Sequence, residues 1–220
     1  MEIDELQPIA GEKKYIIFDL SEVLLTGIKD TGLALAEKHQ LSVAKEHTAA
    51  WTHHATPLLT PLVKEFFNGN VSEDEYINEV LATYPQLGEA ESLKQHIRNN
   101  FKEVEGTRDI IINLKTSGYT LALFSVHAKE WVDYCEQKFN YHDLFDVRVY
   151  SYEDKVSKPD PVSFQKVLSR LAADPAECLF IDDSVFNIEA ARNLGIHSIL
   201  FTTADELQSE LRIMLPDLAP

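Results

Sequence analysis

The chain has 220 residues, of which 45% are hydrophobic, and its formal net charge at pH 7 is −16. This length and this apolar share suffice for one domain with a sizeable core, or for a core with an insert. The negative charge would repel a nucleic-acid backbone and no basic stripe offsets it, so we expect no nucleic-acid partner. Two cysteines, Cys135 and Cys178, do not make a disulfide framework.

Membrane and export signals are also missing from the sequence. No apolar stretch approaches the roughly 18 residues that a membrane helix needs. Residues 1–13 form a polar lead-in without the apolar segment of a signal peptide. We therefore expect a cytoplasmic protein that has no membrane partner.

Short apolar runs alternate with helical patterns along most of the chain. A buried strand is predicted over residues 15–20, and a helix-rich stretch follows from about Gly27 to Asn100, where Ser72 and Glu75 have capping-box spacing. After Gly106, strands are predicted at 120–125, 146–150, 178–182 and 197–201. The helices between and after them are predicted over 109–117, through Trp131 and Phe139, and over 161–171, 187–194 and 205–215.

This alternation predicts an α/β fold: a Rossmann-like parallel sheet core with helices on both faces and a small all-helical insert. The predicted core domain comprises residues 1–26 and 101–220, and the predicted insert, or cap domain, comprises residues 27–100. Ligands of such sheets bind beyond the carboxyl ends of the strands, so the polar residues at those ends are the candidates for a site.

Chemically active side chains stand at those strand ends. Asp19 closes the first strand, Ser125 closes the second, Asp182 and Asp183 close the fourth, and Lys158 lies in a loop before a helix. A carboxylate can attack phosphorus, and carboxylate oxygens suit Mg²⁺. A hydroxyl and a lysine can hold the other phosphoryl oxygens. The residue types therefore indicate phosphoryl transfer.

The chain resembles the haloacid dehalogenase-like superfamily, in the form with an α-helical cap inserted after the first motif. Four motifs carry the resemblance, in order and over nearly the whole chain: Phe18-Asp19-Leu20-Ser21-Glu22-Val23-Leu24, the strand that ends in Ser125, Lys158-Pro159-Asp160-Pro161, and Ile181-Asp182-Asp183-Ser184. The resemblance implies a magnesium-dependent hydrolase of small phosphorylated metabolites, with a cap that shapes substrate choice.

Roles for single residues follow from the same resemblance. Asp19 is implied as the nucleophile and as a Mg²⁺ ligand, and Ser21 as a ligand through its backbone carbonyl and as part of the substrate site. Asp183 is implied to bind the metal directly, with Asp182 beside it or acting through water. Ser125 is implied to hydrogen-bond the phosphoryl group, and Lys158 to pair with Asp19 and the phosphate.

One departure from the family pattern leaves the reaction open. Phosphatases of the family carry a second Asp, the general acid and base, where this chain has Ser21, and usually a Gly where it has Glu22. General acid–base catalysis contributes typically ~10²–10⁴-fold, and serine does not supply it at neutral pH. Three interpretations follow. The chain is a phosphatase in which Glu22, a cap residue or water acts as surrogate, or whose substrate has a good leaving group. Otherwise it is an enzyme with another chemistry of the superfamily, or a catalytically weak binding or regulatory protein.

The other superfamily chemistries are C–halogen cleavage and phosphonate cleavage. Phosphonate cleavage requires a Schiff-base lysine in the cap, and the available residues are Lys29, Lys38, Lys45 and Lys64. The paired Asp182 and Asp183 speak against C–halogen cleavage, since they are typical of phosphatases.

A few further residues have two interpretations each. Asn187 either orients the aspartate pair or faces solvent, and His127 either reaches the pocket or is structural. Phe66 and Phe67 are predicted to be core residues of the insert. The identity of the substrate and the oligomeric state stay open.

Overall fold

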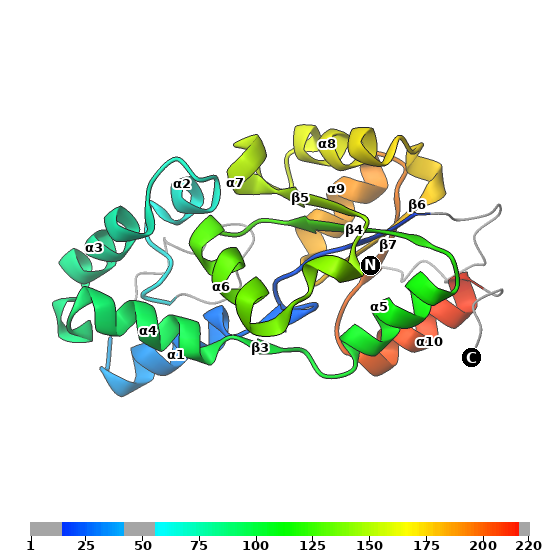
Figure 1. The fold of residues 1–220 in the computed structure, drawn as a ribbon. Coiled ribbons are helices and arrows are strands. Elements are labelled where there is room, and N and C mark those ends of the chain that lie inside the picture. The colour runs from blue at the N-terminus through cyan, green and yellow to red at the C-terminus, as the bar shows by residue number, and fades with distance from the viewer. Residues whose placement is uncertain (1–14, 42–55, 216–220) are drawn as a thin grey trace.

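A five-stranded parallel sheet forms the centre of the molecule. The computed structural model describes residues 15–41 and 56–215, and Figure 1 shows its ribbon. The strand order is β5-β4-β1-β6-β7. The strands are β1 (Tyr15–Phe18), β4 (Thr120–Ser125), β5 (Val147–Tyr150), β6 (Cys178–Asp182) and β7 (His197–Leu200). The predicted parallel α/β core is confirmed; the predicted polar lead-in at 1–13 lies outside the described residues.

Helices cover both faces of this sheet, which explains why its strands are apolar runs instead of alternating patterns. Along β1, Ile16 and Phe18 belong to one apolar cluster and Ile17 to the other. One face carries α8 (Pro161–Leu171) and α9 (Val185–Asn193), and the opposite face carries α5 (Thr107–Thr116), α6 (Lys129–Phe139) and α10 (Ala204–Met214). Shorter elements are α7 (Ser151–Asp154) and the 3₁₀ helices η3 (His142–Leu144) and η4 (Pro175–Glu177).

Between β1 and α5 the described chain forms a helical insert, defined here as residues 28–41 and 56–100. It lies at one end of the molecule in Figure 1. Its elements are α1 (Ile28–Lys38), α2 (Val63–Phe67), α3 (Glu73–Thr83), η2 (Pro85–Leu87) and α4 (Ala90–Asn100). The predicted capping box is present, because Ser72 and Glu75 exchange side-chain to backbone hydrogen bonds at the start of α3. The division into two domains at residues 27 and 100 stays a prediction.

Two short strands mark where the chain enters and leaves the insert. β2 (Leu25–Thr26) pairs antiparallel with β3 (Lys102–Glu103), a ladder that the sequence did not predict. A Cβ atom at Gly27 would lie 2.3 Å from the carbonyl oxygen of Asn100. Only glycine therefore lets the two crossing segments come this close.

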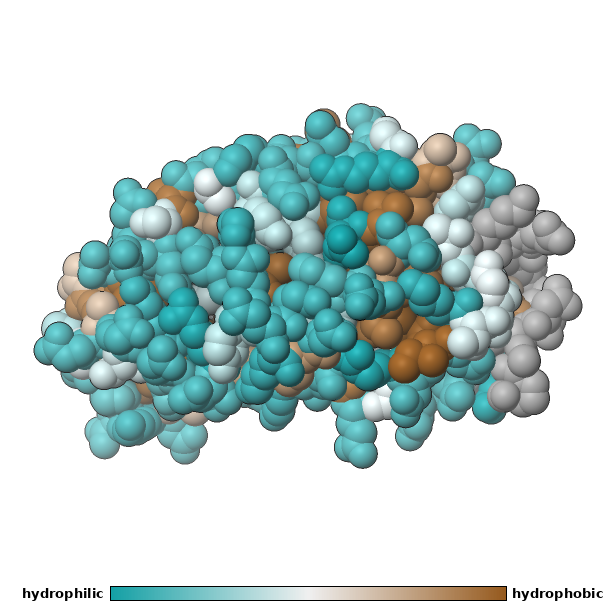
Figure 2. All heavy atoms as spheres, viewed as in Figure 1, coloured by the Kyte–Doolittle hydropathy of each residue, from teal (hydrophilic) through white to brown (hydrophobic). Residues whose placement is uncertain are grey.

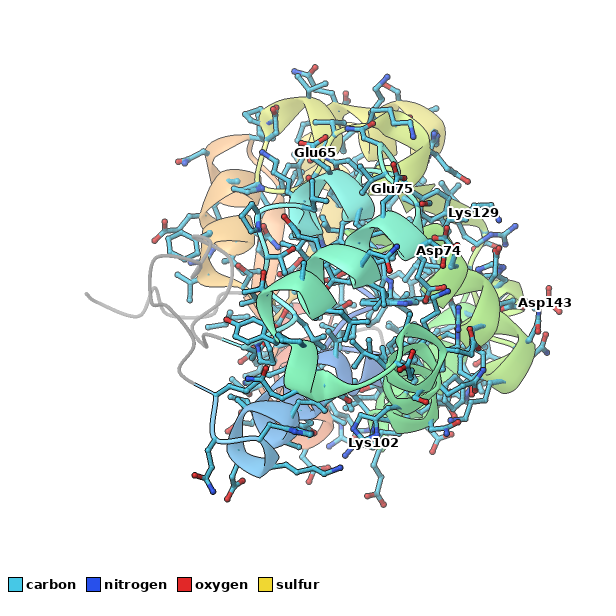
Figure 3. The ribbon with its side chains drawn as sticks, turned by 90° about the vertical axis from the view of Figure 1, so that its left-hand side faces the viewer. Glu65, Asp74, Glu75, Lys102, Lys129 and Asp143 are labelled. Atoms are coloured by element: carbon cyan, nitrogen blue, oxygen red, sulfur yellow. The ribbon has the colours of Figure 1, made fainter. Side chains whose placement is uncertain are left out.

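The insert is bonded to the core through buried polar contacts. The indole N–H of Trp131 in α6 donates to the carboxylate of Glu73, and Ser157 donates to the side-chain oxygen of Asn68 over 2.8 Å. Figure 3 looks onto this end of the molecule, where Asp74 and Glu75 lie on the outer surface while their neighbour Glu73 is buried.

The described surface is mostly polar on the face that Figure 2 shows, where hydrophilic residues cover most of the area. Within the ranges that the structure describes, no helix is both long and apolar enough to cross a membrane.

Candidate active site

Lys158 lies between two carboxylates at the carboxyl ends of neighbouring strands. Its Nζ atom is 3.0 Å from Oδ1 of Asp19, which follows β1, and 2.6 Å from Oδ2 of Asp182, which ends β6. The same Nζ donates to the carbonyl oxygen of Phe124 over 2.9 Å. The three donors of the ammonium group thus each have an acceptor, which fixes the buried side chain in one orientation.

Asp182 is held from the other side by the start of α9. Asn187 donates through Nδ2 to both carboxylate oxygens, at 2.9 and 3.1 Å, and the backbone N–H of Ser184 donates to Oδ1 over 2.8 Å. Asn187 therefore orients the aspartate and does not simply face solvent. Ser184 is the N-cap residue of α9, but no side-chain capping bond is made there.

Three carboxylates converge beside this lysine. One oxygen from each of Asp19, Asp182 and Asp183 lies within 4.8 Å of the others. When all are ionised, three carboxylates against the single ammonium of Lys158 leave two negative charges, since 3 − 1 = 2. Closely spaced carboxylate oxygens with this surplus fit a hard divalent cation such as Mg²⁺.

The local charges shift the protonation of these groups. Burial is the main cause that raises the pKa of Asp19; the charge of Lys158 lowers it, the charges of Asp182 and Asp183 raise it, and the net pKa lies well above its usual value. Asp183 lies at the surface of the cavity and keeps part of its area exposed. The protein atoms around its carboxyl group still desolvate it, and this, followed by the charge of Asp182, raises its pKa to about 7. Burial lowers the pKa of Lys158, while the attraction of Asp182 and Asp19 outweighs it and raises the net value.

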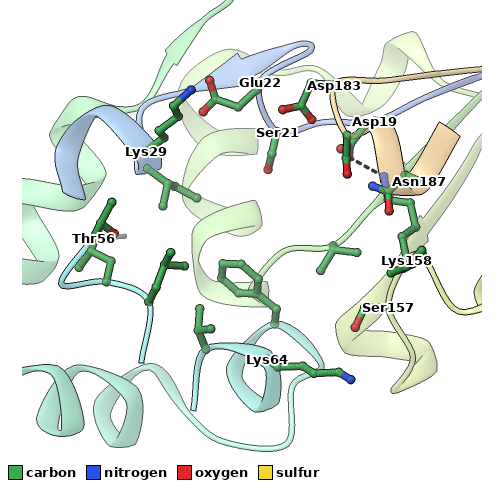
Figure 4. Close-up of a pocket in the computed structure, with 18 of the residues that line it drawn as sticks. Asp19, Ser21, Glu22, Lys29, Thr56, Lys64, Ser157, Lys158, Asp183 and Asn187 are labelled. Atoms are coloured by element: carbon green, nitrogen blue, oxygen red, sulfur yellow. Dashed lines mark ion pairs between the residues drawn. The ribbon is translucent and has the colours of Figure 1, made fainter. Parts of the chain in front are cut away.

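A cavity of ≈ 320 Å³ opens above Asp19, between the core and the helical insert (Figure 4). Core residues form its polar side, and the figure shows Asp19, Ser21 and Asp183 facing the space, with the ion pair of Asp19 and Lys158 dashed. The insert forms the other side with Ile28, Lys29, Thr56, Leu58, Leu59, Val63, Lys64, Phe67 and Tyr76. Sequence reasoning did not predict these lining residues.

Ser125 ends β4 but does not line the cavity, whereas the next residue, Val126, does. The serine is fully buried, and its Oγ has no hydrogen-bond partner in the part of the chain that the structure describes. A buried hydroxyl without a partner is costly. Its predicted role in binding a phosphoryl group stays a prediction.

The turn after Asp19 places two side chains in the cavity wall. Ser21 and Glu22 both line the cavity, and Glu22 has a φ of 59°. This left-handed conformation favours glycine. The Glu22 carboxylate accepts a hydrogen bond of 2.8 Å from Thr26, and burial raises its pKa. A carboxyl group therefore stands near the position where Ser21 replaces the usual acid.

His127 packs among aromatic side chains and does not line the cavity. Its ring is buried 5.9 Å from the ring of Phe67 in the insert and 5.9 Å from that of Trp131 in α6. Burial lowers the pKa of His127 to about 4, so the imidazole is neutral near pH 7. The structural interpretation of this histidine holds.

Sequence relatives of the chain include enzymes with different reactions. The chain is 25% identical over 210 residues to D-ribitol-5-phosphate phosphatase of Bacteroides thetaiotaomicron, covering 92% of this chain and 98% of the relative. It is 20% identical to (S)-2-haloacid dehalogenase 4A of Burkholderia cepacia, covering 90% and 83%. It is 24% identical to flavin mononucleotide hydrolase 1 of Arabidopsis thaliana, covering 67% of this chain and only 59% of that protein.

Solved structures and a family model agree on the fold. A haloacid dehalogenase family enzyme from Bacteroides thetaiotaomicron, solved as a magnesium complex, superposes with a TM-score of 0.74 at 20% identity, over 92% of this chain and 100% of the other. The model of the family described as haloacid dehalogenase-like hydrolase matches residues 16–201. The chain therefore belongs to the haloacid dehalogenase-like hydrolase family.

Proposed function

We propose that the protein is a Mg²⁺-dependent phosphatase of small phosphorylated molecules that works through an aspartyl phosphate at Asp19. The observation that carries the proposal is the position of Lys158, which bridges Asp19 and Asp182 on the floor of an open cavity. The similarity to a sugar-alcohol phosphatase and to a flavin mononucleotide hydrolase supports it. A cytoplasmic location stays a prediction.

The reaction has two balanced steps. A carboxylate oxygen of Asp19 attacks phosphorus, the bond from phosphorus to the ester oxygen breaks, and the departing oxygen takes up a proton. Water then attacks the phosphoryl group, which releases inorganic phosphate and restores the Asp19 carboxylate. Lys158 stays beside Asp19 in both steps and offsets the negative charge that develops.

Asp19 and Asp183 would hold the metal through their carboxylates and Ser21 through its backbone carbonyl, with Asp182 beside the metal or acting through water. When bound, Mg²⁺ supplies charge neutralisation for the phosphoryl oxygens and polarises the phosphorus centre. The surplus of two negative charges at the carboxylates matches that role. The helical insert acts as the cap over the substrate in this proposal.

The missing acid at Ser21 bears on the rival proposal of a catalytically weak binding or regulatory protein. If Glu22 or side chains of the insert filled the cavity, a binding or regulatory role would be favoured. Instead, Glu22 is tied to Thr26 and the cavity is open. The open space therefore supports turnover, with water or Glu22 supplying protons.

C–halogen cleavage is the second candidate, and Ser21 is the observation that favours it. A halide leaves without taking up a proton, so displacement by Asp19 needs no general acid. The carboxylate cluster with Asp183 speaks against this reaction, because it adds negative charge where a halide would depart. Phosphonate cleavage would need a lysine nucleophile in the insert, and such amines are typically desolvated. Lys29 and Lys64 line the cavity, but their side chains are exposed. Lys38 does not line the cavity, and Lys45 lies outside the described residues.

One assay separates these candidates. Phosphate release from a panel of small phosphoesters is measured with and without Mg²⁺, for the wild type and for Asp19→Asn, while halide release from 2-haloacids is measured in parallel. Metal-dependent phosphate release that the variant loses is the expected result. Halide release alone would establish the dehalogenase, and neither product from a protein that still binds Mg²⁺ would move the assignment to a binding role.

A further inference from the structure

The cavity has two chemically different sides. The core contributes carboxylates, Lys158 and backbone groups, all next to Asp19. Most of the described insert residues that line the cavity are apolar: Ile28, Leu58, Leu59, Val63 and Phe67. In Figure 4 the core carboxylates and the insert residues Thr56 and Lys64 face each other across the space. A phosphoryl group held at Asp19 would direct the organic part of an ester toward the insert.

Among the described insert residues at the wall, few uncharged groups are left to pair with a substrate hydroxyl. Tyr76 is one of the lining residues, and its hydroxyl donates to the carbonyl oxygen of Leu58. Thr56 supplies the other hydroxyl among the described insert residues at the wall. A buried substrate hydroxyl without a partner weakens binding, so a polyol would be disfavoured here.

Two lysines at the wall suit a phosphate that enters an acidic protein. Lys29 and Lys64 line the cavity with exposed side chains, and their ammonium groups can reach solvent while their methylene stems cover apolar surface. They lower the repulsion of a dianion by a chain with net charge −16.

The volume limits the size of the ligand. At ≈ 320 Å³ the cavity lies near the lower end of the roughly 300–1,000 Å³ that small-molecule sites span. We propose that the substrate is a monophosphate ester whose organic group is compact and apolar, bound against Leu59, Val63 and Phe67. This inference rests on the proposed function, because it places the phosphoryl group at Asp19.

Phosphonates test the inference without turnover, because their C–P bond replaces the ester bond that would break. Binding of butylphosphonate and of its dihydroxylated analogue is measured by calorimetry on the full chain in saturating MgCl₂. We expect butylphosphonate to bind about tenfold more tightly. From methylphosphonate to butylphosphonate, each added methylene should tighten binding roughly fourfold until the cavity is full.

A matched pair of variants locates the effect at the insert wall. Val63→Thr keeps the shape and adds a hydroxyl to the cavity, so it should shrink the preference for butylphosphonate by about threefold or more. Val80→Thr makes the same change at a buried insert residue that does not line the cavity, and it should leave the preference unchanged.

The outcomes separate this inference from the proposed function. Equal binding of the two phosphonates, or tighter binding of the diol, would overturn the apolar substrate class and leave the phosphatase proposal standing. A butylphosphonate preference without Mg²⁺-dependent phosphate release would sink the phosphatase proposal and keep the apolar recognition. No binding of either compound would overturn the apolar substrate class, and the phosphate release assay would still decide the phosphatase proposal.

Discussion

Trp131 donates its indole N–H to the carboxylate of Glu73 over 2.8 Å, and so joins helix α6 of the core to helix α3 of the insert. Both residues are buried. The carboxylate also pairs with Arg98 in α4. A carboxylate in this position is stable only while its partners remain, because burial of an unpaired charge is costly.

Trp131→Phe is therefore expected to weaken the attachment of the insert. The phenyl ring keeps the aromatic packing but leaves one bond of the buried Glu73 carboxylate unmade, which costs about 1–3 kcal/mol of unfolding free energy. Urea denaturation measures the loss. Gln137→Ala, an exposed change on the same helix, should stay within about 0.5 kcal/mol. Equal stabilities of Trp131→Phe and the wild type would show that the bond contributes nothing net.

Lys158→Met should destabilise the protein and stop phosphate release. The variant leaves two buried carboxylates, Asp19 and Asp182, without their shared counter-charge, and breaking a buried pair costs about 3–5 kcal/mol. Unfolding in metal-free buffer and phosphate release measure the two effects. Lys166→Met removes an exposed lysine from α8 as the control and should change neither. A loss below about 1 kcal/mol would contradict the ion-pair account.

Ser21→Asp should raise the phosphate release rate at least about tenfold, since a positioned acid and base contributes ~10²–10⁴-fold. Ser21 lines the cavity, so the new carboxyl group can reach a bound ester. Ser21→Asn is the matched control, with similar size and no titratable group. A gain that both variants share would point to shape instead of proton transfer, and no gain in either would mean that the site is remodelled elsewhere.

His127 should make stability depend on pH. Its pKa falls from 6.5 to about 4 on folding, so between these values the unfolded chain binds more protons than the folded one. The stability that neutral His127 contributes is therefore full above pH 6.5 and declines as the pH falls toward 4, by up to about 3 kcal/mol. His127→Phe keeps an aromatic ring and should remove this decline in thermal unfolding scans. The exposed-histidine control His96→Gln should keep it.

The strands and helices of the core follow closely from the sequence. The predicted bounds of β4, β6 and α8 agree with the structure, because each strand is a continuous apolar run and α8 begins with a proline at its first turn. The convergence of Asp19, Lys158 and Asp182 was predictable too, since neighbouring parallel strands end at one edge of the sheet.

The remainder depends on contacts between segments that are distant in the chain. The ladder of β2 and β3 has two residues on each side, too few for any periodic pattern. Phe66 and Phe67 look alike in sequence, yet the phase of α2 turns only Phe67 to the cavity. Both are buried core residues as predicted, and what the sequence did not predict is that Phe67 also lines the cavity. Ser125 illustrates the same limit, because strand position alone did not predict that its side chain lies outside the cavity wall.

The pairing of β2 with β3 also bears on how such proteins diversify. The chain leaves the core at Thr26 and returns at Lys102, and these two residues are direct partners in the ladder. A segment whose two ends already touch can be lengthened, shortened or exchanged without moving the strands that hold Asp19 and Asp182, since closing a longer loop adds little entropy. Under the proposed function, substrate recognition by the insert can therefore change while the carboxylates at the strand ends keep their places.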